Sequence, residues 1–319
     1  MFKNLHELFT KMPTEQDCRN YLASQRWQDG KAVCPSCENN KCYTILGGKR
    51  YKCSDKKCNR QFSVVVGTVF ECSNIPLSKW LMAVFLATGH KKGISSHQLA
   101  RDLGITQKSA WFMLHRIRTV MCDNTDIVFE GIIQSDETFM SRKYRSDYVG
   151  LSEAEIDYKL ANSRESKGAV VGLYDKKTGK IKPLVFDRLD RDKITDVIMD
   201  NVKLGSTLHT DESSLYRKLE YNGYYRESVV HSRKEWVKTS ISAGKVHCNN
   251  VENFWSVMKR GIHGIYHGIS YKHLNRYAQE FAYRYNSRDL KDYQRFELTI
   301  QNLDGRLTHK QLVGDIRVK

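Results

Sequence analysis

Hydrophobic and polar positions change their spacing along the chain, and this change predicts several kinds of segment. Residues 1–29 and 76–122 repeat apolar positions at the spacing of amphipathic helices. Residues 30–70 are polar and rich in cysteine, with short alternating stretches. From about residue 128 the pattern becomes three strands, a helix and a further strand, and a long helical region over 247–289 precedes a polar tail. Strands followed by helices at these lengths predict an α/β or α+β fold for the second half.

Charge indicates the kind of partner. The 319 residues include 52 Lys and Arg against 36 Asp and Glu, a formal net charge of +16. Such an excess repels itself, so it indicates a polyanionic partner, either nucleic acid or an anionic membrane. The longest apolar run, residues 80–88, is too short to cross a bilayer, and the first residues lack the order of a secretory signal. We therefore expect nucleic acid and no membrane.

Four of the nine cysteines form two close pairs, Cys34-x2-Cys37 and Cys53-x4-Cys58. Two such pairs in a small polar segment are typical of a tetrahedral four-cysteine zinc site, which would hold one structural Zn²⁺ because four thiolates leave no open position. The alternatives are four unrelated reduced cysteines, or Cys42 as a competing ligand. The same segment contains basic residues that we expect to contact DNA phosphates: Lys49, Arg50, Lys52, Lys56, Lys57 and Arg60.

Residues 94–118 have the pattern of two helices joined at Gly104, with Ser95 and Thr106 as expected N-caps. In a helix-turn-helix motif the second helix enters the major groove of DNA. The side chains that this helix would expose to DNA are Gln107, Lys108, Trp111, His115 and Arg118. The alternative is a helical hairpin that only packs against its neighbours.

Three acidic residues lie in suggestive places in the second half. Asp136 lies on the first expected strand, Asp211 ends a later one, and Glu252 opens the long helical region. Two strand acids and one helix acid suit a site for two Mg²⁺ ions that transfers phosphoryl groups. Each strand acid is followed by a glutamate, and spacing does not decide which member points inward. Lys259 shares a helix face with Glu252, where it would hold a DNA phosphate.

Several blocks of the sequence resemble one known family. Residues 247–288 (HCNNVENFWSVMKRGIHGIYHGISYKHLNRYAQEFAYRYNSR), the upstream strings SDETF and HTDESSLY, the cysteine segment and GTVFECSNIPLSKW are similar to transposases of the IS1595 family, ISXO2-like group. The resemblance implies an RNase H-like catalytic domain with a DDE triad. Its members would be Asp136, Asp211 and Glu252, with Lys259 as the accompanying basic residue and Mg²⁺ or Mn²⁺ as the cofactor, two ions per site.

Two departures from the family pattern leave the three acids untouched. The chain has Met140-Ser-Arg-Lys where Gly-Gly is common, and Gln134-Ser135 is unusual in the strand before it.

The sequence as a whole thus predicts a DNA transposase of cut-and-paste type, acting in the cytoplasm of a prokaryotic cell near its nucleoid. It would bind the terminal inverted repeats of an element, cut there and join the ends to target DNA, as a homodimer or higher oligomer on DNA. The alternatives are a non-catalytic DNA-binding regulator and an RNase H-like nuclease that cuts without joining.

The expected division of the chain follows from these segments: a helical segment over 1–29, a zinc ribbon over 30–70, a helix-turn-helix-like domain over 71–125, an RNase H-like domain over 126–290 with a mobile insertion near 142–167, and a C-terminal tail over 291–319.

Overall fold

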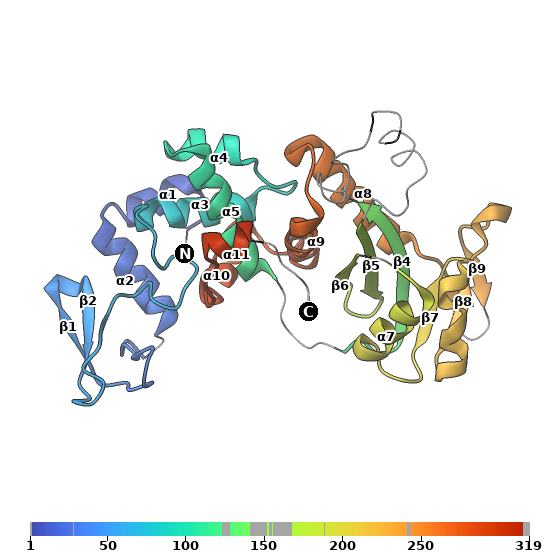
Figure 1. Cartoon of the computed structure of the whole chain (residues 1–319), viewed down its shortest axis with the longest axis horizontal. Coiled ribbons are helices and arrows are strands. Elements are labelled where there is room, and N and C mark those ends of the chain that lie inside the picture. The colour runs from blue at the N-terminus through green and yellow to red at the C-terminus, as the bar shows by residue number, and fades with distance from the viewer. Residues whose placement is uncertain are drawn as a thin grey trace. The chain divides into compact units, whose positions relative to one another are not determined.

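The computed structural model divides the chain into two compact units (Figure 1). Unit 1 comprises Met1–Met121 and Ser287–Lys319, and unit 2 comprises Cys122–Asn286. The structure describes residues 2–27, 29–122, 128–140, 152, 155, 168–187, 189–240 and 244–314, so the insertion expected near 142–167 lies almost wholly outside the described residues.

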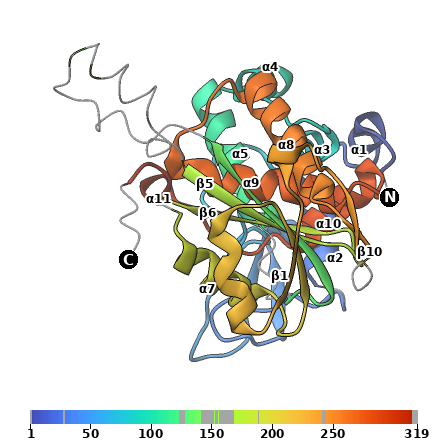
Figure 2. The same ribbon diagram turned by 90° about the vertical axis from the view of Figure 1, so that its right-hand side faces the viewer.

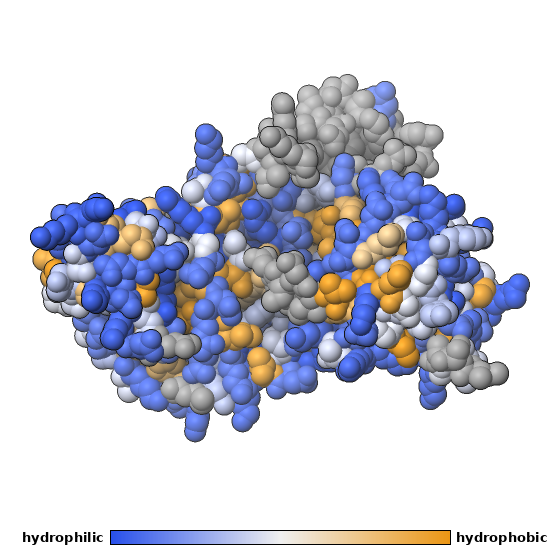
Figure 3. All heavy atoms as spheres, turned by 90° about the horizontal axis from the view of Figure 1, so that it is seen from below, coloured by the Kyte–Doolittle hydropathy of each residue, from blue (hydrophilic) through white to orange (hydrophobic). Residues whose placement is uncertain are grey.

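Hydrophilic side chains cover most of the face seen in Figure 3, and apolar ones form small patches among them. Within the described part of the chain, no helix combines the length and the apolar character needed to cross a membrane.

Unit 1 begins with two helices and a three-stranded antiparallel sheet, in which β2 pairs with both β1 and β3. The bounds of these elements are α1 (Leu5–Lys11), α2 (Glu15–Arg26), β1 (Cys42–Ile45), η1 (Leu46–Gly48), β2 (Arg50–Cys53) and β3 (Gln61–Phe62). Helix α2 begins with a capping box, because Thr14 and Asp17 each accept a hydrogen bond from the other's backbone N–H.

The helical part of unit 1 contains α3 (Leu77–Gly89), α4 (Ser96–Leu103), α5 (Gln107–Met121), α10 (Asp292–Gln301) and α11 (His309–Val313). Both predicted N-caps are confirmed. The hydroxyl of Ser95 accepts the N–H of Gln98 at 3.1 Å, and that of Thr106 accepts the N–H of Ser109 at 3.2 Å. Gly104, with φ of 56°, ends α4 in the left-handed conformation that glycine tolerates best.

The prediction of a polar C-terminal tail is wrong. Helix α10 packs against α3, and Phe296 and Ile300 on it are buried, as are Leu303, Leu307 and Leu312 after it. The first four of these buried residues are each flanked by polar ones, so the segment has low mean hydropathy although it has an apolar side. The last part of the chain therefore completes the core of unit 1.

Unit 2 is built on a five-stranded mixed sheet of order β6-β5-β4-β7-β8 (Figures 1 and 2). The strands are β4 (Ile132–Met140), β5 (Gly168–Asp175), β6 (Ile181–Phe186), β7 (Thr207–Thr210) and β8 (Tyr225–Ser228). The first three pair antiparallel, and β4, β7 and β8 are parallel. This mixed α/β architecture confirms the predicted fold class, an RNase H-like domain.

Helices cover both faces of this sheet, which is why all eight residues of β5 are buried. Alternate residues of β5 enter two cores: Val170 and Tyr174 pack with α8 and α9, and Val171 and Leu173 pack with α7 and η4. The elements that surround the sheet are α7 (Arg191–Asn201), η4 (Ser214–Asn222), η5 (His231–Arg233), β9 (Lys238–Ser240), β10 (Gly244–Val246), α8 (Asn249–Gly261), η6 (Ile262–Tyr266) and α9 (Tyr271–Asn286).

A glycine sets how closely α8 approaches the sheet. Gly172 on β5 lies opposite Asp136 on β4. A Cβ at Gly172 would lie 2.8 Å from the Trp255 ring and 2.9 Å from the Val251 side chain, both on α8. Only a residue without a side chain therefore fits where α8 crosses β5.

Candidate active site and zinc centre

The four cysteines of the predicted ribbon come together in unit 1. Their sulfur atoms all lie within 4.8 Å of one another, with Cys34 Sγ 3.7 Å from Cys58 Sγ and Cys37 Sγ 3.6 Å from Cys53 Sγ. Four thiolates at a Zn–S distance of 2.3 Å in a tetrahedron would be separated by about 3.8 Å. The cluster therefore fits one structural zinc ion.

The two cysteine loops have the same backbone pattern despite their different lengths. The N–H of Cys34 donates to the carbonyl oxygen of Asn39, and the N–H of Cys53 donates to that of Arg60, both at 2.9 Å. The residue after each second cysteine is left-handed, with φ of 57° at Glu38 and 44° at Asn59. Each turn brings two thiols to one side, so the longer second loop holds its pair as the first does.

Position separates the four ligands from their neighbour Cys42. Burial raises the pKa of Cys34, but backbone N–H groups of Ser36 and Cys37 and contacts with other thiols lower it, to about 7. Burial raises the pKa of Cys42 to about 11, and its Sγ contacts the carbonyl oxygen of Asn39 at 3.5 Å. Cys42 lies outside the cluster.

Three aromatic rings form the core of the ribbon. Trp27 packs edge-on against Tyr51 with ring centroids 4.9 Å apart, and Tyr51 stacks on Phe62 at 5.8 Å. These rings pack with the buried cysteines. Arg50 is exposed and Lys52 half-buried on strand β2.

The face predicted to read DNA is only partly exposed. Lys108 is exposed, Trp111 is half-buried, and Gln107 is half-buried and donates to the hydroxyl of the first residue of α4 at 2.8 Å. His115 and Arg118 are 0% and 2% exposed, so the prediction that they face DNA is wrong. The reason is that six consecutive residues ending at Arg118 are buried, so this half of α5 has no polar outer face.

The three acids of unit 2 lie on two adjacent strands and on the helix that packs against them. Asp136 lies in the middle of β4, Asp211 directly follows the neighbouring parallel strand β7, and Glu252 lies in the first turn of α8. Cys248, where α8 begins, has its pKa raised by burial and then by the charges of Asp136, Asp211 and Glu252. Two hydrogen bonds connect β4 to α8 beside these acids: the N–H of Asn250 donates to Gln134 Oε1, and Trp255 Nε1 donates to Asp136 Oδ2.

Burial and neighbouring negative charges both act on Asp136. Burial raises its pKa to about 7, together with the charges of Glu137 and Asp211, against a hydrogen bond from Trp255 Nε1 to Asp136 Oδ2 at 3.0 Å. Oxygen ligands that repel one another are the environment that a divalent cation stabilises, so the donor set fits Mg²⁺. Among the described residues, only the cysteines bring three or more possible ligand atoms within 4.8 Å of one another. The oxygen atoms of the three acids are therefore farther apart than the cysteine sulfur atoms.

The two neighbouring acids of each pair, Asp136-Glu137 and Asp211-Glu212, lie in different environments. Glu137 points away from α8, because strand residues alternate between faces, and its Oε2 accepts a hydrogen bond from the buried Tyr216 hydroxyl at 2.7 Å. Asp136 is on the α8 side. Asp211 is half-buried, whereas Glu212 is exposed and accepts a hydrogen bond from a serine of η5. In the first pair the aspartate is the member on the α8 side, and in the second it is the less exposed member.

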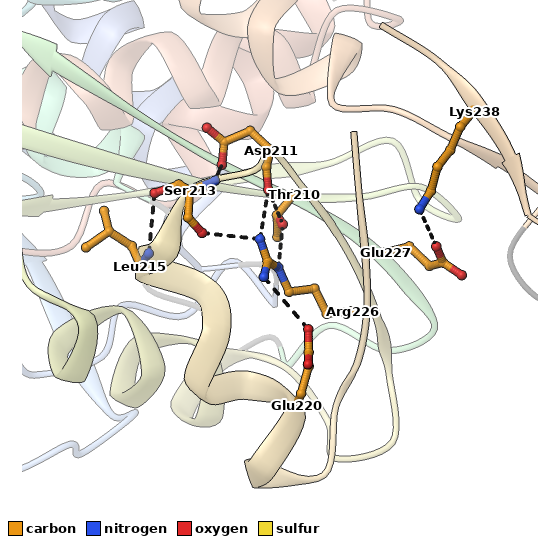
Figure 4. Close-up of polar contacts among 8 residues, drawn as sticks. All are labelled: Thr210, Asp211, Ser213, Leu215, Glu220, Arg226, Glu227 and Lys238. Atoms are coloured by element: carbon orange, nitrogen blue, oxygen red, sulfur yellow. Dashed lines mark hydrogen bonds and ion pairs between the residues drawn. The ribbon is translucent and has the colours of Figure 1, made fainter. Parts of the chain in front are cut away.

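An arginine that the sequence analysis did not single out holds the loop of Asp211 (Figure 4). Arg226 on β8 donates from Nε to Thr210 Oγ1 at 2.9 Å, and from Nη2 to the carbonyl oxygens of Asp211 at 2.9 Å and Ser213 at 3.2 Å. Its side chain is 8% exposed, and its carboxylate partner Glu220 is 3.8 Å away. No motif marks this residue; only the pairing of β7 with β8 brings it to the loop.

A second buried side chain fixes the start of α8. Gln134, 0% exposed on β4, accepts the backbone N–H of Asn250 at 3.2 Å, and its Nε2 lies 3.3 Å from His247 Nδ1. Gln134 is two residues before Asp136, and Asn250 is two residues before Glu252. The unusual Gln134-Ser135 pair was the available signal for this contact.

Two further residues bear on Glu252: Lys259, which the sequence analysis predicted, and His231, which it did not. Lys259 is exposed on α8, two turns after Glu252. His231 on η5 places Nε2 3.5 Å from Glu252 Oε1. Glu252 is thus contacted from the segment after β8.

Comparisons with known proteins match both units. The ISXO2-like transposase domain matches residues 128–286, and the transposase zinc-ribbon domain of the same IS1595 group matches residues 13–61. The chain is 28% identical over 280 residues to "Uncharacterized protein in transposable element ISH50" of Halobacterium salinarum, covering 85% of this chain and 90% of that protein.

Among solved structures, a chain of the simian T-cell lymphotropic virus intasome in complex with PP2A regulatory subunit B56 gamma is 12% identical. The match covers 70% of this chain and 72% of that one, with a TM-score of 0.26, too low to equate the two folds.

Proposed function

The chain belongs to the ISXO2-like, IS1595 family of DDE transposases, and we propose that it cuts an element from DNA and joins it elsewhere by a cut-and-paste reaction. The observation that carries the proposal is the placement of three acids on connected elements: Asp136 on β4, Asp211 directly after the adjacent parallel strand β7, and Glu252 in the first turn of α8. Three carboxylates from two adjacent strands and a helix supply the oxygen ligands that phosphoryl transfer with divalent metals requires.

Asp136, Asp211 and Glu252 are the residues that would hold two Mg²⁺ or Mn²⁺ ions. When bound, these ions supply Lewis-acid stabilisation of the attacking and leaving oxygens. Trp255 fixes the Asp136 carboxylate through its Nε1–H, and the Gln134 amide fixes the first turn of α8, on which Glu252 lies. Lys259, exposed on α8, would hold a phosphate of the bound strand.

The proposed reaction has two balanced displacements at phosphorus. In the first, a water oxygen bonds to phosphorus, the P–O3′ bond breaks, and the element end is released as a 3′-hydroxyl. In the second, that hydroxyl oxygen attacks a target phosphodiester, and the target's own P–O3′ bond breaks. The leaving oxygen takes up a proton each time, and no covalent bond to the protein forms.

We assign recognition of the terminal inverted repeats to unit 1. Arg50 and Lys52 supply positive charge on the zinc ribbon, and Lys108 supplies it at the start of α5. Gln107 and Trp111, close to Lys108 in the sequence, are half-buried. Two ends must be joined in one event, so we expect a homodimer or higher oligomer on DNA.

The test is Mg²⁺-dependent cleavage and joining of a DNA fragment with the element's own ends, assayed with a supercoiled target plasmid. Glu252→Gln and Asp136→Asn should abolish both products while end binding stays within about twofold. Glu212→Gln removes an exposed acid beside Asp211 and should retain both products, which makes it the matched control.

Two outcomes would overturn the proposal. Cleavage without joined products would make the protein an RNase H-like nuclease. Specific end binding without cleavage by the folded wild-type protein would make it a DNA-binding regulator.

A further inference from the structure

The segment between β8 and β9 carries a tryptophan whose ring is largely in solvent. Trp236 is 56% exposed, and Val237 beside it is 47% exposed. A large aromatic ring is usually withdrawn from water, because its burial is favourable by a few kcal/mol. An exposed ring on an ordered segment therefore needs an explanation from what it contacts.

The backbone of this segment forms a closed turn. The N–H of Glu235 donates to the carbonyl oxygen of Val230 at 3.1 Å, and the Glu235 carboxylate accepts the N–H of Val230 at 3.1 Å. Lys234, with φ of 60°, completes the turn. The turn ends just before Trp236, so the position of the ring is set by these bonds.

The same turn contacts the candidate active site at two points. His231 places Nε2 3.5 Å from Glu252 Oε1, and Ser232 donates to Glu212, the neighbour of Asp211, at 2.9 Å. The Trp236 ring packs on the His231 ring, with centroids 4.8 Å apart and planes inclined by 40°. Trp236 is thus linked to Glu252 through one intervening side chain.

Charge around the ring suits a nucleic acid strand. Arg233 and Lys234, which precede Trp236 in the turn, are both exposed. Proteins that bind unpaired DNA combine basic side chains along the backbone with aromatic rings on which bases stack. A protein partner would bury Val237 as well, but the adjacent arginine and lysine favour a phosphate-bearing ligand over an apolar surface.

We propose that Trp236 stacks an unpaired nucleobase of the DNA strand next to the scissile phosphate. The proposal rests on the proposed function, since it takes the phosphate to lie at Asp136, Asp211 and Glu252. Opening the terminal base pairs would free the strand to follow the protein surface to the three acids, and stacking on Trp236 would offset part of the cost of lost pairing.

The experiment compares two end duplexes, one fully paired and one with two unpaired nucleotides at the cleavage position, bound to the full chain without added Mg²⁺. The variants are Trp236→Ala and Trp236→Phe. The control is Tyr221→Ala, which removes another exposed ring of unit 2, at the far end of η4 and 90% exposed. A 2-aminopurine base at the unpaired position reports stacking through quenching of its fluorescence.

Trp236→Ala should weaken binding of the unpaired duplex by about 5- to 150-fold, the range for one lost stacked base. It should abolish the quenching, leave the paired duplex within about twofold, and keep the wild-type melting temperature. Trp236→Phe should restore at least part of both signals, and Tyr221→Ala should match the wild type.

Equal weakening of both duplexes, no weakening of either, or a Phe variant no better than the Ala variant would overturn the proposal. Its failure is separate from failure of the proposed function. The latter is judged by whether the wild-type protein cuts and joins ends, and the former by whether Trp236 distinguishes the two duplexes.

Discussion

The guanidinium of Arg226 is hydrogen-bonded to the backbone of Asp211: Nη2 donates to the carbonyl oxygen of that residue at 2.9 Å. The same side chain bonds Thr210 and Ser213, on either side of it (Figure 4). Asp211 Oδ1 in turn accepts the N–H of Ser213 at 3.0 Å. The direction of this carboxylate thus depends on a residue 15 positions later, on the next strand.

Replacing Arg226 with Lys should therefore weaken the response of cleavage to Mg²⁺ more than it lowers the stability of the fold. A lysine ammonium keeps the charge but lacks the planar set of donors that reaches three acceptors at once. We expect the Mg²⁺ concentration for half-maximal cleavage to rise about 10- to 100-fold, as for other residues that orient metal ligands. The measurement is cleavage rate against Mg²⁺ concentration.

Glu220→Gln is the matched control for Arg226→Lys, since it removes the exposed ion-pair partner of the same guanidinium and leaves its bonds to the loop. Its Mg²⁺ dependence should equal that of the wild type. A lysine variant with unchanged Mg²⁺ dependence would mean that Asp211 keeps its direction without the arginine.

Burial of Asp136, together with repulsion from its acidic neighbours, predicts a pH-dependent effect on stability in the absence of Mg²⁺. Its folded-state pKa of about 7 lies above the ordinary value of 3.8, so the folded protein binds this proton more tightly than the unfolded chain. Stability is therefore lost as pH rises from about 4 to 7, by at most about 4 kcal/mol at 1.36 kcal/mol per pKa unit. Asp136→Asn should raise the melting temperature at pH 8 and change it little at pH 4.

Thermal melts across pH, with and without Mg²⁺, check this. Mg²⁺ should stabilise the wild-type protein more than the Asp136→Asn variant, because only the former has the repulsion to relieve. Glu212→Gln removes a solvent-exposed charge and should show neither effect. An asparagine variant no more stable at pH 8 would contradict the repulsion.

Because α8 packs closely on the sheet at Gly172, adding one methyl group there should lower both stability and cleavage. In Gly172→Ala the new Cβ would meet the Trp255 ring at 2.8 Å and Val251 at 2.9 Å, both buried in a packed core. Overpacking of this kind costs about 1–3 kcal/mol. Since α8 carries both Glu252 and the Trp255 bond to Asp136, cleavage should fall more than the melting temperature suggests.

Gly264→Ala is the control for Gly172→Ala, because no atom lies within 4 Å of a Cβ built there. It should cleave as the wild type does. Full activity of Gly172→Ala at normal stability would mean that α8 shifts without moving Glu252 from its place.

The acidic residues of the site could be predicted from the sequence, whereas the residues that hold them in place could not. The sequence blocks around Asp136, Asp211 and Glu252 could be recognised because acids and their neighbours form short strings. Arg226 could not, because only strand pairing brings it to Asp211. His115 was misjudged for a related reason: helical periodicity shows which side of α5 is most apolar, but not that the opposite side is buried too.

The zinc centre predicts that one thiol matters and its neighbour does not. Cys34→Ser removes a ligand of the four-sulfur cluster, so the ribbon should lose its zinc and its fold, since such small segments need the metal. Cys42→Ser, a nearby thiol outside the cluster, should keep one zinc per chain. Metal content after dialysis, paired with binding of the element's ends, measures both effects. A full zinc content in Cys34→Ser, or loss of zinc from Cys42→Ser, would contradict the ligand set. Loss of zinc from Cys34→Ser with unchanged end binding would mean that the ribbon does not recognise the DNA ends.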